Sequence, residues 1–129
     1  YATAGLGMTM VIVAAGIEDA YTVFATDPQL SNRFTPAVLP RWKLDKEGGA
    51  LLASFERRLP LRKPSGLKQP EILQKVLWMS EGLIGEIYEV LKRAAVQAIH
   101  DGEEQITLGG LDRIRWTRPS DRREKPSLA

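Results

Sequence analysis

The chain has 129 residues, enough for one compact domain with a modest hydrophobic core. Its 43% hydrophobic and 26% charged residues are typical of an ordinary globular protein, and no apolar run approaches the ~20 residues that span a bilayer. We therefore expect a cytoplasmic protein without membrane association. The net charge of +2 is too small to indicate nucleic-acid binding by itself, and the lack of cysteine excludes disulfides and thiolate metal sites.

The first expected element is a β-strand over residues 8–15, MTMVIVAA, which meets Gly16. A dense apolar run bounded by glycine is typical of a strand buried on both faces of a parallel sheet. The chain offers no second strand of this kind, and an isolated strand cannot satisfy its backbone hydrogen bonds. Because the sequence also begins at Tyr1 without an initiator methionine, we expect the back end of a larger α/β domain whose other strands lie upstream.

Helices are expected over most of the remaining chain, because apolar residues recur there at helical spacing. The expected helices cover residues 17–26, 44–59, 70–79 and 83–100. Asp45 is suited to cap the start of the helix at 44–59, and Pro70 suits the first position of the helix at 70–79. Gly102 is a suitable residue just past the end of the helix at 83–100. Three helices with short connections can form a small bundle. We therefore predict a mainly α chain, a small helical bundle with one leftover β-strand.

Basic residues gather in two places. From Asp112 to Ala129, six basic residues stand against three acids, which predicts a solvated, flexible tail. The functional alternative is an arm that contacts DNA phosphates through Arg118, Arg122 and Arg123. The loop at residues 60–67 has a basic tip, Arg62 and Lys63. It is either a proline-stiffened connection or a contact with DNA or a neighbouring subunit.

Other chemistry finds little support. His100 is the only histidine, so we expect no metal site, and no serine has a credible histidine partner for a hydrolytic triad. The carboxylates Glu81, Glu86 and Glu89 are interpreted as a solvated helical face rather than an acid–base pair.

Four segments carry a family resemblance: DPQLSNRF at residues 27–34, LPRW at 39–42, LPLRKPS at 59–65 and SEGLIG at 80–85. Together they resemble the C-terminal half of TniB-type transposition proteins, which are AAA+ ATPases that act beside a transposase. The likeness spans roughly residues 6–111, and its first and third motifs are the specific ones. It implies a remnant of the AAA+ core at residues 1–36, a helical lid at 37–111 and a basic tail at 112–129.

The resemblance also implies a role for Arg33. In that family an arginine after the sensor-1 strand and its helix reaches the nucleotide of the neighbouring subunit, and Arg33 stands in the matching place. Such an arginine finger accelerates hydrolysis by roughly 10³ to 10⁵. The alternative is a surface arginine that pairs with Asp27 or caps a turn. ATP and Mg²⁺ would be held by the intact parent, because no Gly-x-x-x-x-Gly-Lys-Ser/Thr motif occurs here.

Two positions depart from the family pattern. Ile17 stands where relatives carry a small polar residue that holds the attacking water, so Glu18 or Asp19 would have to substitute, or hydrolysis is slow. Gly85 stands where many AAA+ lids place an arginine that faces the phosphates. It implies close packing of the lid against backbone or the adenine, not a phosphate contact.

Three functions follow as expectations. The resemblance implies a fragment of an ATP-dependent transposition regulator that assembles on DNA as a ring or filament and recruits or activates a transposase; the fragment alone would not hydrolyse ATP. The alternative is a stand-alone helical module that binds DNA or protein without nucleotide chemistry. In the third, the strand at residues 8–15 pairs with a second copy of itself, since an unpaired apolar strand promotes association.

Overall fold

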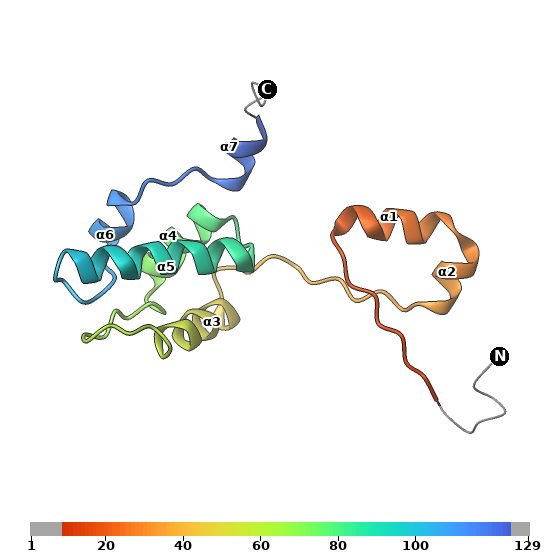
Figure 1. Cartoon of the computed structure of the whole chain (residues 1–129), viewed down its shortest axis with the longest axis horizontal. Coiled ribbons are helices and arrows are strands. Elements are labelled where there is room, and N and C mark those ends of the chain that lie inside the picture. The colour runs from red at the N-terminus through yellow and green to blue at the C-terminus, as the bar shows by residue number, and fades with distance from the viewer. Residues whose placement is uncertain (1–8, 125–129) are drawn as a thin grey trace. The chain divides into compact units, whose positions relative to one another are not determined.

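The computed structural model describes residues 9–124 and divides the chain into two compact units, residues 1–39 and 40–129 (Figure 1). The described part is mainly helical, with seven helices and no strand. The predicted mainly α class is therefore confirmed. None of the described helices has both the length and the apolar character needed to cross a membrane.

The first unit contains two short helices, α1 (Glu18–Thr26) and α2 (Pro28–Arg33). Asp27 separates them, and its side-chain Oδ1 accepts a hydrogen bond of 2.9 Å from the backbone N–H of Gln29. This is an N-cap contact that satisfies a free donor of the first turn of α2. The rings of Phe24 and Phe34 meet edge to face with centroids 5.4 Å apart, which joins the helix ends.

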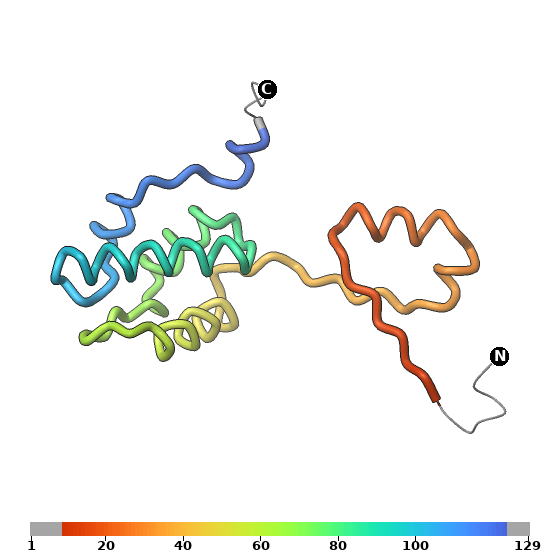
Figure 2. The backbone as a smooth tube through the Cα atoms, viewed as in Figure 1, coloured from red at the N-terminus to blue at the C-terminus, as the bar shows by residue number. Residues whose placement is uncertain are grey.

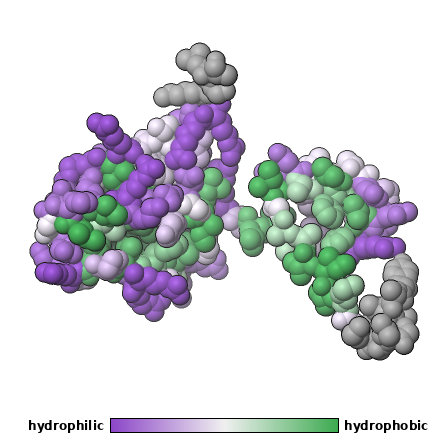
Figure 3. Space-filling model, viewed as in Figure 1, coloured by the Kyte–Doolittle hydropathy of each residue, from purple (hydrophilic) through white to green (hydrophobic). Residues whose placement is uncertain are grey.

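The predicted strand at residues 8–15 is not formed in the described residues 9–15, and Met8 lies outside them. A strand needs a neighbouring strand to pair its backbone groups, and none is formed within residues 9–124. The apolar side chains of the run are therefore left on the surface, with Val11 80% and Val13 85% exposed. Figure 3 shows apolar side chains gathered on the surface of this unit.

The second unit is a helical bundle. Its helices are α3 (Lys46–Glu56), α4 (Pro70–Ser80), α5 (Ile84–His100), α6 (Leu108–Arg113) and α7 (Pro119–Glu124). The first three confirm the helices expected at 44–59, 70–79 and 83–100, although α3 is shorter at both ends. Asp45 caps α3 as predicted, since its Oδ1 accepts a bond of 2.9 Å from the backbone N–H of Gly48.

The core of this unit lies where α3, α4, α5 and α6 meet. Each fully buried aliphatic side chain there stabilises the fold by about 1.5–3 kcal/mol relative to an exposed one. The apolar stripes of α4 and α5 supply most of the core, and the chain before α6 adds one isoleucine. The most buried members are Leu52, Leu67, Val76, Ile87, Val90, Leu91, Ile106 and Leu111.

The corner between α4 and α5 requires a glycine. Gly82 has φ +74°, a left-handed conformation, and its carbonyl oxygen accepts a bond of 2.9 Å from the backbone N–H of Trp42. A Cβ on Gly82 would lie 2.5 Å from the Trp42 carbonyl oxygen. The corner therefore holds the start of the second unit, and the Trp42 side chain packs against the core.

After α6 the chain returns along α5 towards the start of that helix, as Figure 2 shows. The indole Nε1–H of Trp116 donates a bond of 2.7 Å to the Met79 carbonyl oxygen at the end of α4. The expectation of a solvated tail from Asp112 is therefore wrong for the described residues 112–124. The rest of the expected tail, residues 125–129, lies outside the described part.

Candidate functional site

Arg33 is the last residue of α2 and is exposed. Two contacts fix the helix end that carries it. The backbone N–H of Phe34 donates to the Leu30 carbonyl oxygen at 3.2 Å, and the Phe34 ring packs on Phe24. Arg33 thus lies at a fixed helix end on the surface of the first unit. Its role as an arginine finger stays a prediction.

The position expected for the sensor-1 polar residue begins α1. Ile17 is the N-cap residue of α1, makes no side-chain cap hydrogen bond and is 74% exposed. Glu18 and Asp19 occupy the first turn, where negative charge interacts favourably with the helix dipole. Both acids are exposed, so they are available for the substitution that the sequence suggested, and that role also stays a prediction.

Gly85 is the second residue of α5. A Cβ placed on it would meet no other atom of the described structure within 4 Å. Apart from its own helix turn and chain neighbours, Gly85 therefore faces open space in the described structure, and close packing against other backbone stays a prediction. Packing against a bound nucleotide stays a prediction.

The loop at residues 60–67 is organised by Glu56, the last residue of α3. One carboxylate oxygen accepts hydrogen bonds from the backbone N–H groups of Ser65 at 2.6 Å and Gly66 at 2.7 Å. The other accepts from Leu67 at 3.3 Å. Charge-assisted bonds of this kind are about twice as strong as neutral ones. Sequence reasoning missed Glu56, because nothing in the local pattern indicates an acid that binds ten residues ahead.

Two further bonds tie the same loop to the chain before α6. The Ser65 Oγ accepts from the Ile106 N–H at 2.8 Å, and the Lys63 N–H donates to the Glu104 carbonyl oxygen at 3.0 Å. Residues 63–67 of the loop are therefore fixed by hydrogen bonds on two sides. The predicted DNA contacts at its tip, Arg62 and Lys63, are both exposed, and the Arg62 Nε lies 4.0 Å from Glu104 Oε1.

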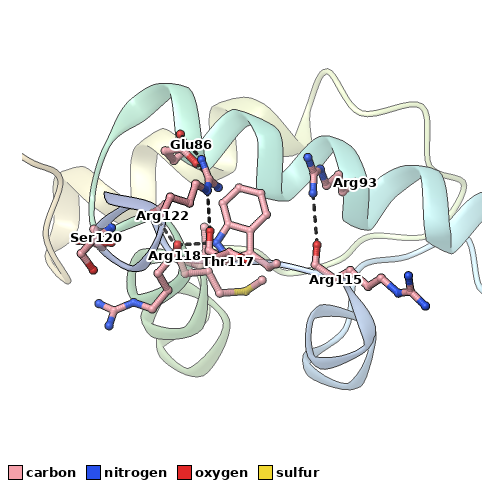
Figure 4. Close-up of polar contacts among 12 residues, drawn as sticks. Glu86, Arg93, Arg115, Thr117, Arg118, Ser120 and Arg122 are labelled. Carbon is pink, nitrogen blue, oxygen red and sulfur yellow. Dashed lines mark hydrogen bonds and ion pairs between the residues drawn. The ribbon is translucent and has the colours of Figure 1, made fainter. Parts of the chain in front are cut away.

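Two of the three basic residues predicted to contact DNA from the tail make contacts with the helical bundle instead (Figure 4). The Arg118 Nε donates to the Trp78 carbonyl oxygen at 3.0 Å, and its guanidinium lies 4.6 Å from the Trp78 ring centroid. Arg122 binds both carboxylate oxygens of Glu86, at 3.2 and 3.0 Å. Arg123 is exposed. DNA contacts by these residues stay a prediction, and Arg118 and Arg122 would have to exchange these partners for phosphates.

Glu81, Glu86 and Glu89 do not form the single solvated face that was expected, because Glu86 pairs with Arg122 and Glu81 also has a partner. The backbone N–H of Ser120 donates to Glu81 Oε2 at 2.7 Å. This bond lowers the pKa of Glu81, aided by the positive charges of Arg118 and Arg41 and opposed by partial burial. Glu81 therefore ties the start of α7 to the α4–α5 corner, and only Glu89 behaves as the solvated acid that was expected, paired with Lys92 at 3.0 Å.

Comparison with known proteins adds one finding. The family model of the bacterial TniB protein matches residues 6–44, less than one third of the chain. The matched segment contains α1, α2 and Arg33. No curated protein and no solved structure gives a significant match. Over these residues the chain is similar to the TniB family.

Proposed function

We propose that this chain supplies the arginine finger and the helical lid of an AAA+ ATPase that regulates DNA transposition. The observation that carries the proposal is the family match over residues 6–44, which includes the DPQLSNRF motif and its Arg33. The rest of the function follows from the chemistry of this arginine and from the two units of the fold.

Arg33 is suited to a phosphate. Its guanidinium is permanently charged and presents a planar fork of donors that matches phosphate oxygens. It stands exposed at the end of α2, a helix whose start is capped by Asp27. An arginine held this way can enter the nucleotide site of a neighbouring subunit and stabilise the charge that develops on the γ-phosphate.

The surface of the first unit supports a larger assembly. Four consecutive apolar residues lie on this surface with 67–85% of each exposed: Met10, Val11, Ile12 and Val13. A contiguous apolar surface of this kind is normally covered by another layer of protein. In the proposal the run is a strand of the parent sheet, and its neighbours come from polypeptide outside this sequence.

ATP and Mg²⁺ fit this chain only in part. Arg33 can bind phosphate oxygens, and Gly85 adds no side chain to the surface at the start of α5. No residue of the chain forms a Gly-x-x-x-x-Gly-Lys-Ser/Thr loop, so other polypeptide would hold the phosphates and the metal. The assembly would act on DNA as a ring or filament and would recruit or activate a transposase.

A second candidate is a helical module that binds DNA or protein without nucleotide chemistry. The observation in its favour is that the second unit has a hydrophobic core of its own, as an independent module needs. Replacing Arg62 and Lys63 with glutamate tests it, because both side chains are exposed and the loop is fixed by backbone bonds. The module predicts DNA affinity that falls steeply with salt and drops in this variant. The AAA+ proposal predicts little change in the DNA affinity of this chain when Arg62 and Lys63 are replaced.

The test of the proposed function is ATP turnover by the longer protein that contains this chain, measured with DNA. We expect Arg33→Ala to reduce turnover by roughly 10³ to 10⁵ while ATP binding is retained. Arg58→Ala is the matched control, because Arg58 is exposed and lies outside the family match. Unchanged turnover in Arg33→Ala would contradict the proposal.

A further inference from the structure

A groove of about 910 Å³ lies within the second unit. It is lined by α3, by the chain at residues 59–65 and by the start of α4. Its apolar lining comes from Leu44, Ala50, Ala53, Leu59, Leu61 and Leu73. Leu44 is 54% exposed, so this surface is open to a partner.

The rim of the groove is basic. Five of the described lining residues are cationic: Lys46, Arg57, Arg62, Lys63 and Lys68. Two are acidic, Asp45 and Glu56, and both face backbone donors. Asp45 caps α3, and the two oxygens of Glu56 accept from residues 65, 66 and 67. Among these five cations, Arg62 alone has an acid within 4.0 Å in the described part of the chain, namely Glu104. The charge available to a ligand at this rim is therefore positive.

We propose that this groove binds a short amphipathic segment of a partner polypeptide, with apolar side chains on the groove floor and acidic side chains at the rim. Burial of the apolar face supplies the driving force for such a complex, and the rim charges select the partner and its orientation. An amphipathic helix laid into an apolar groove is a common mode of peptide recognition. The inference stands apart from the nucleotide chemistry proposed above.

The composition of the groove disfavours nucleic acid and nucleotides as its occupant. Binding of unpaired bases relies on aromatic side chains that stack on them. None of the described lining residues is aromatic. A phosphodiester backbone could meet the rim, but it would leave the leucine floor exposed to water. An acidic amphipathic peptide satisfies both surfaces.

The walls of the groove are fixed before any ligand arrives. Glu56 holds the backbone at residues 65–67, and Ser65 is bonded in turn to the Ile106 N–H at 2.8 Å. A preformed site loses less conformational entropy on binding than a flexible loop does. The groove can therefore bind a short segment without first folding its own wall.

The test is a selection of random 15-residue peptides displayed against the complete 129-residue chain, with depletion against Ala50→Glu. Ala50 is exposed on α3, so glutamate is tolerated there, while its bulk and negative charge block the groove. The depletion step also removes peptides that bind the exposed apolar run of the first unit. We expect enrichment of peptides with apolar residues at helical spacing and a net negative charge.

The selected peptides are then measured by titration. The double variant Lys63→Glu/Lys68→Glu is expected to weaken binding at least tenfold, because it reverses two rim charges. Lys92→Glu is the matched charge reversal on α5, outside the groove, and is expected to change binding less than twofold. Affinity should fall as salt rises, since the rim contacts are exposed.

Several results would overturn the inference. One is a selection that enriches nothing over Ala50→Glu, or one that enriches basic or purely polar peptides. Another is equal binding of the selected peptides to the wild-type chain and the rim variant. A duplex DNA that displaces them, or self-association of the chain that Ala50→Glu abolishes, would assign the groove to nucleic acid or to a second copy instead.

Discussion

Arg122 and Glu86 form a two-point ion pair between segments that lie 36 positions apart in the sequence. The Nη1 lies 3.2 Å from Oε1 and the Nη2 lies 3.0 Å from Oε2. The same guanidinium lies 4.9 Å from the ring centroid of Trp116, whose indole N–H is bonded to the end of α4. Together these contacts hold residues 116–122 against the corner between α4 and α5.

Replacing Arg122 with alanine is predicted to lower the free energy of unfolding by about 1 kcal/mol. The pair is two-point but partly exposed, which limits its contribution, and the contact with the Trp116 ring adds to it. Urea unfolding of the variant measures this value. Arg123→Ala is the control, because Arg123 is exposed on the same helix, and we expect a change within about 0.5 kcal/mol. Equal effects of the two variants would contradict the assigned role of Arg122.

The contacts of Glu81 are expected to make the free energy of unfolding depend on pH. Its folded-state pKa lies below the ordinary value of 4.5, chiefly because of the Ser120 N–H, so the folded state binds fewer protons than the unfolded state. The stability that Glu81 contributes is therefore complete above pH 4.5 and is lost as the pH falls through the lowered pKa. We expect Glu81→Gln to lose this contribution and to approach the wild type in acid. Unfolding profiles of the two proteins that run parallel from neutral pH to about pH 3 would exclude this role.

Glu56→Gln is predicted to destabilise the second unit by about 2 kcal/mol. The substitution removes the charge that strengthens three backbone hydrogen bonds and turns an amide donor towards those N–H groups. Glu89→Gln is the matched control, because it removes only one exposed pair with Lys92 and should cost about 0.5 kcal/mol. Thermal unfolding measures both. Similar melting temperatures for the two variants would show that the loop does not depend on Glu56.

Alanine is expected to change the free energy of unfolding in opposite directions at Gly82 and Gly85. Gly82→Ala should destabilise by more than about 2 kcal/mol, because it places a Cβ in a left-handed residue and 2.5 Å from the Trp42 carbonyl oxygen. Gly85→Ala should stabilise by about 0.5–1 kcal/mol, because Gly85 is helical and a Cβ there meets open space. Denaturant unfolding of both variants gives the signs. The same sign for both would refute the geometry of the corner.

Local patterns in the sequence predict the helices of the bundle well. The apolar stripes of α4 and α5, the cap by Asp45 and the proline at the start of α4 all lie where the residues indicated. These signals act within one or two turns of chain, so they can be read without the fold. α3 includes Gly48 and Gly49, although glycine inside a helix costs about 1 kcal/mol relative to alanine, and both glycines are buried within the unit.

The features that sequence could not predict depend on distant contacts. The tail looked solvated because its residues are polar, but Trp116 and Arg122 find partners 36 or 37 positions earlier. Glu56 likewise acts on a loop that begins after its helix has ended. The expected strand at residues 8–15 shows the reverse case. Its pattern is that of a buried strand, but residues 9–15 form none, and no strand occurs among residues 9–124 to pair with them.

The role proposed for Arg33 is to act at the nucleotide of a neighbouring subunit. Its most direct test mixes two inactive forms of the longer protein, one with Arg33→Ala and one with the phosphate-binding lysine replaced. We expect that each is inactive alone and that mixed assemblies on DNA recover ATP turnover, since an intact phosphate site then meets an intact Arg33 from its neighbour. Full turnover by Arg33→Ala alone, or no recovery in mixed assemblies that still bind ATP, would contradict it.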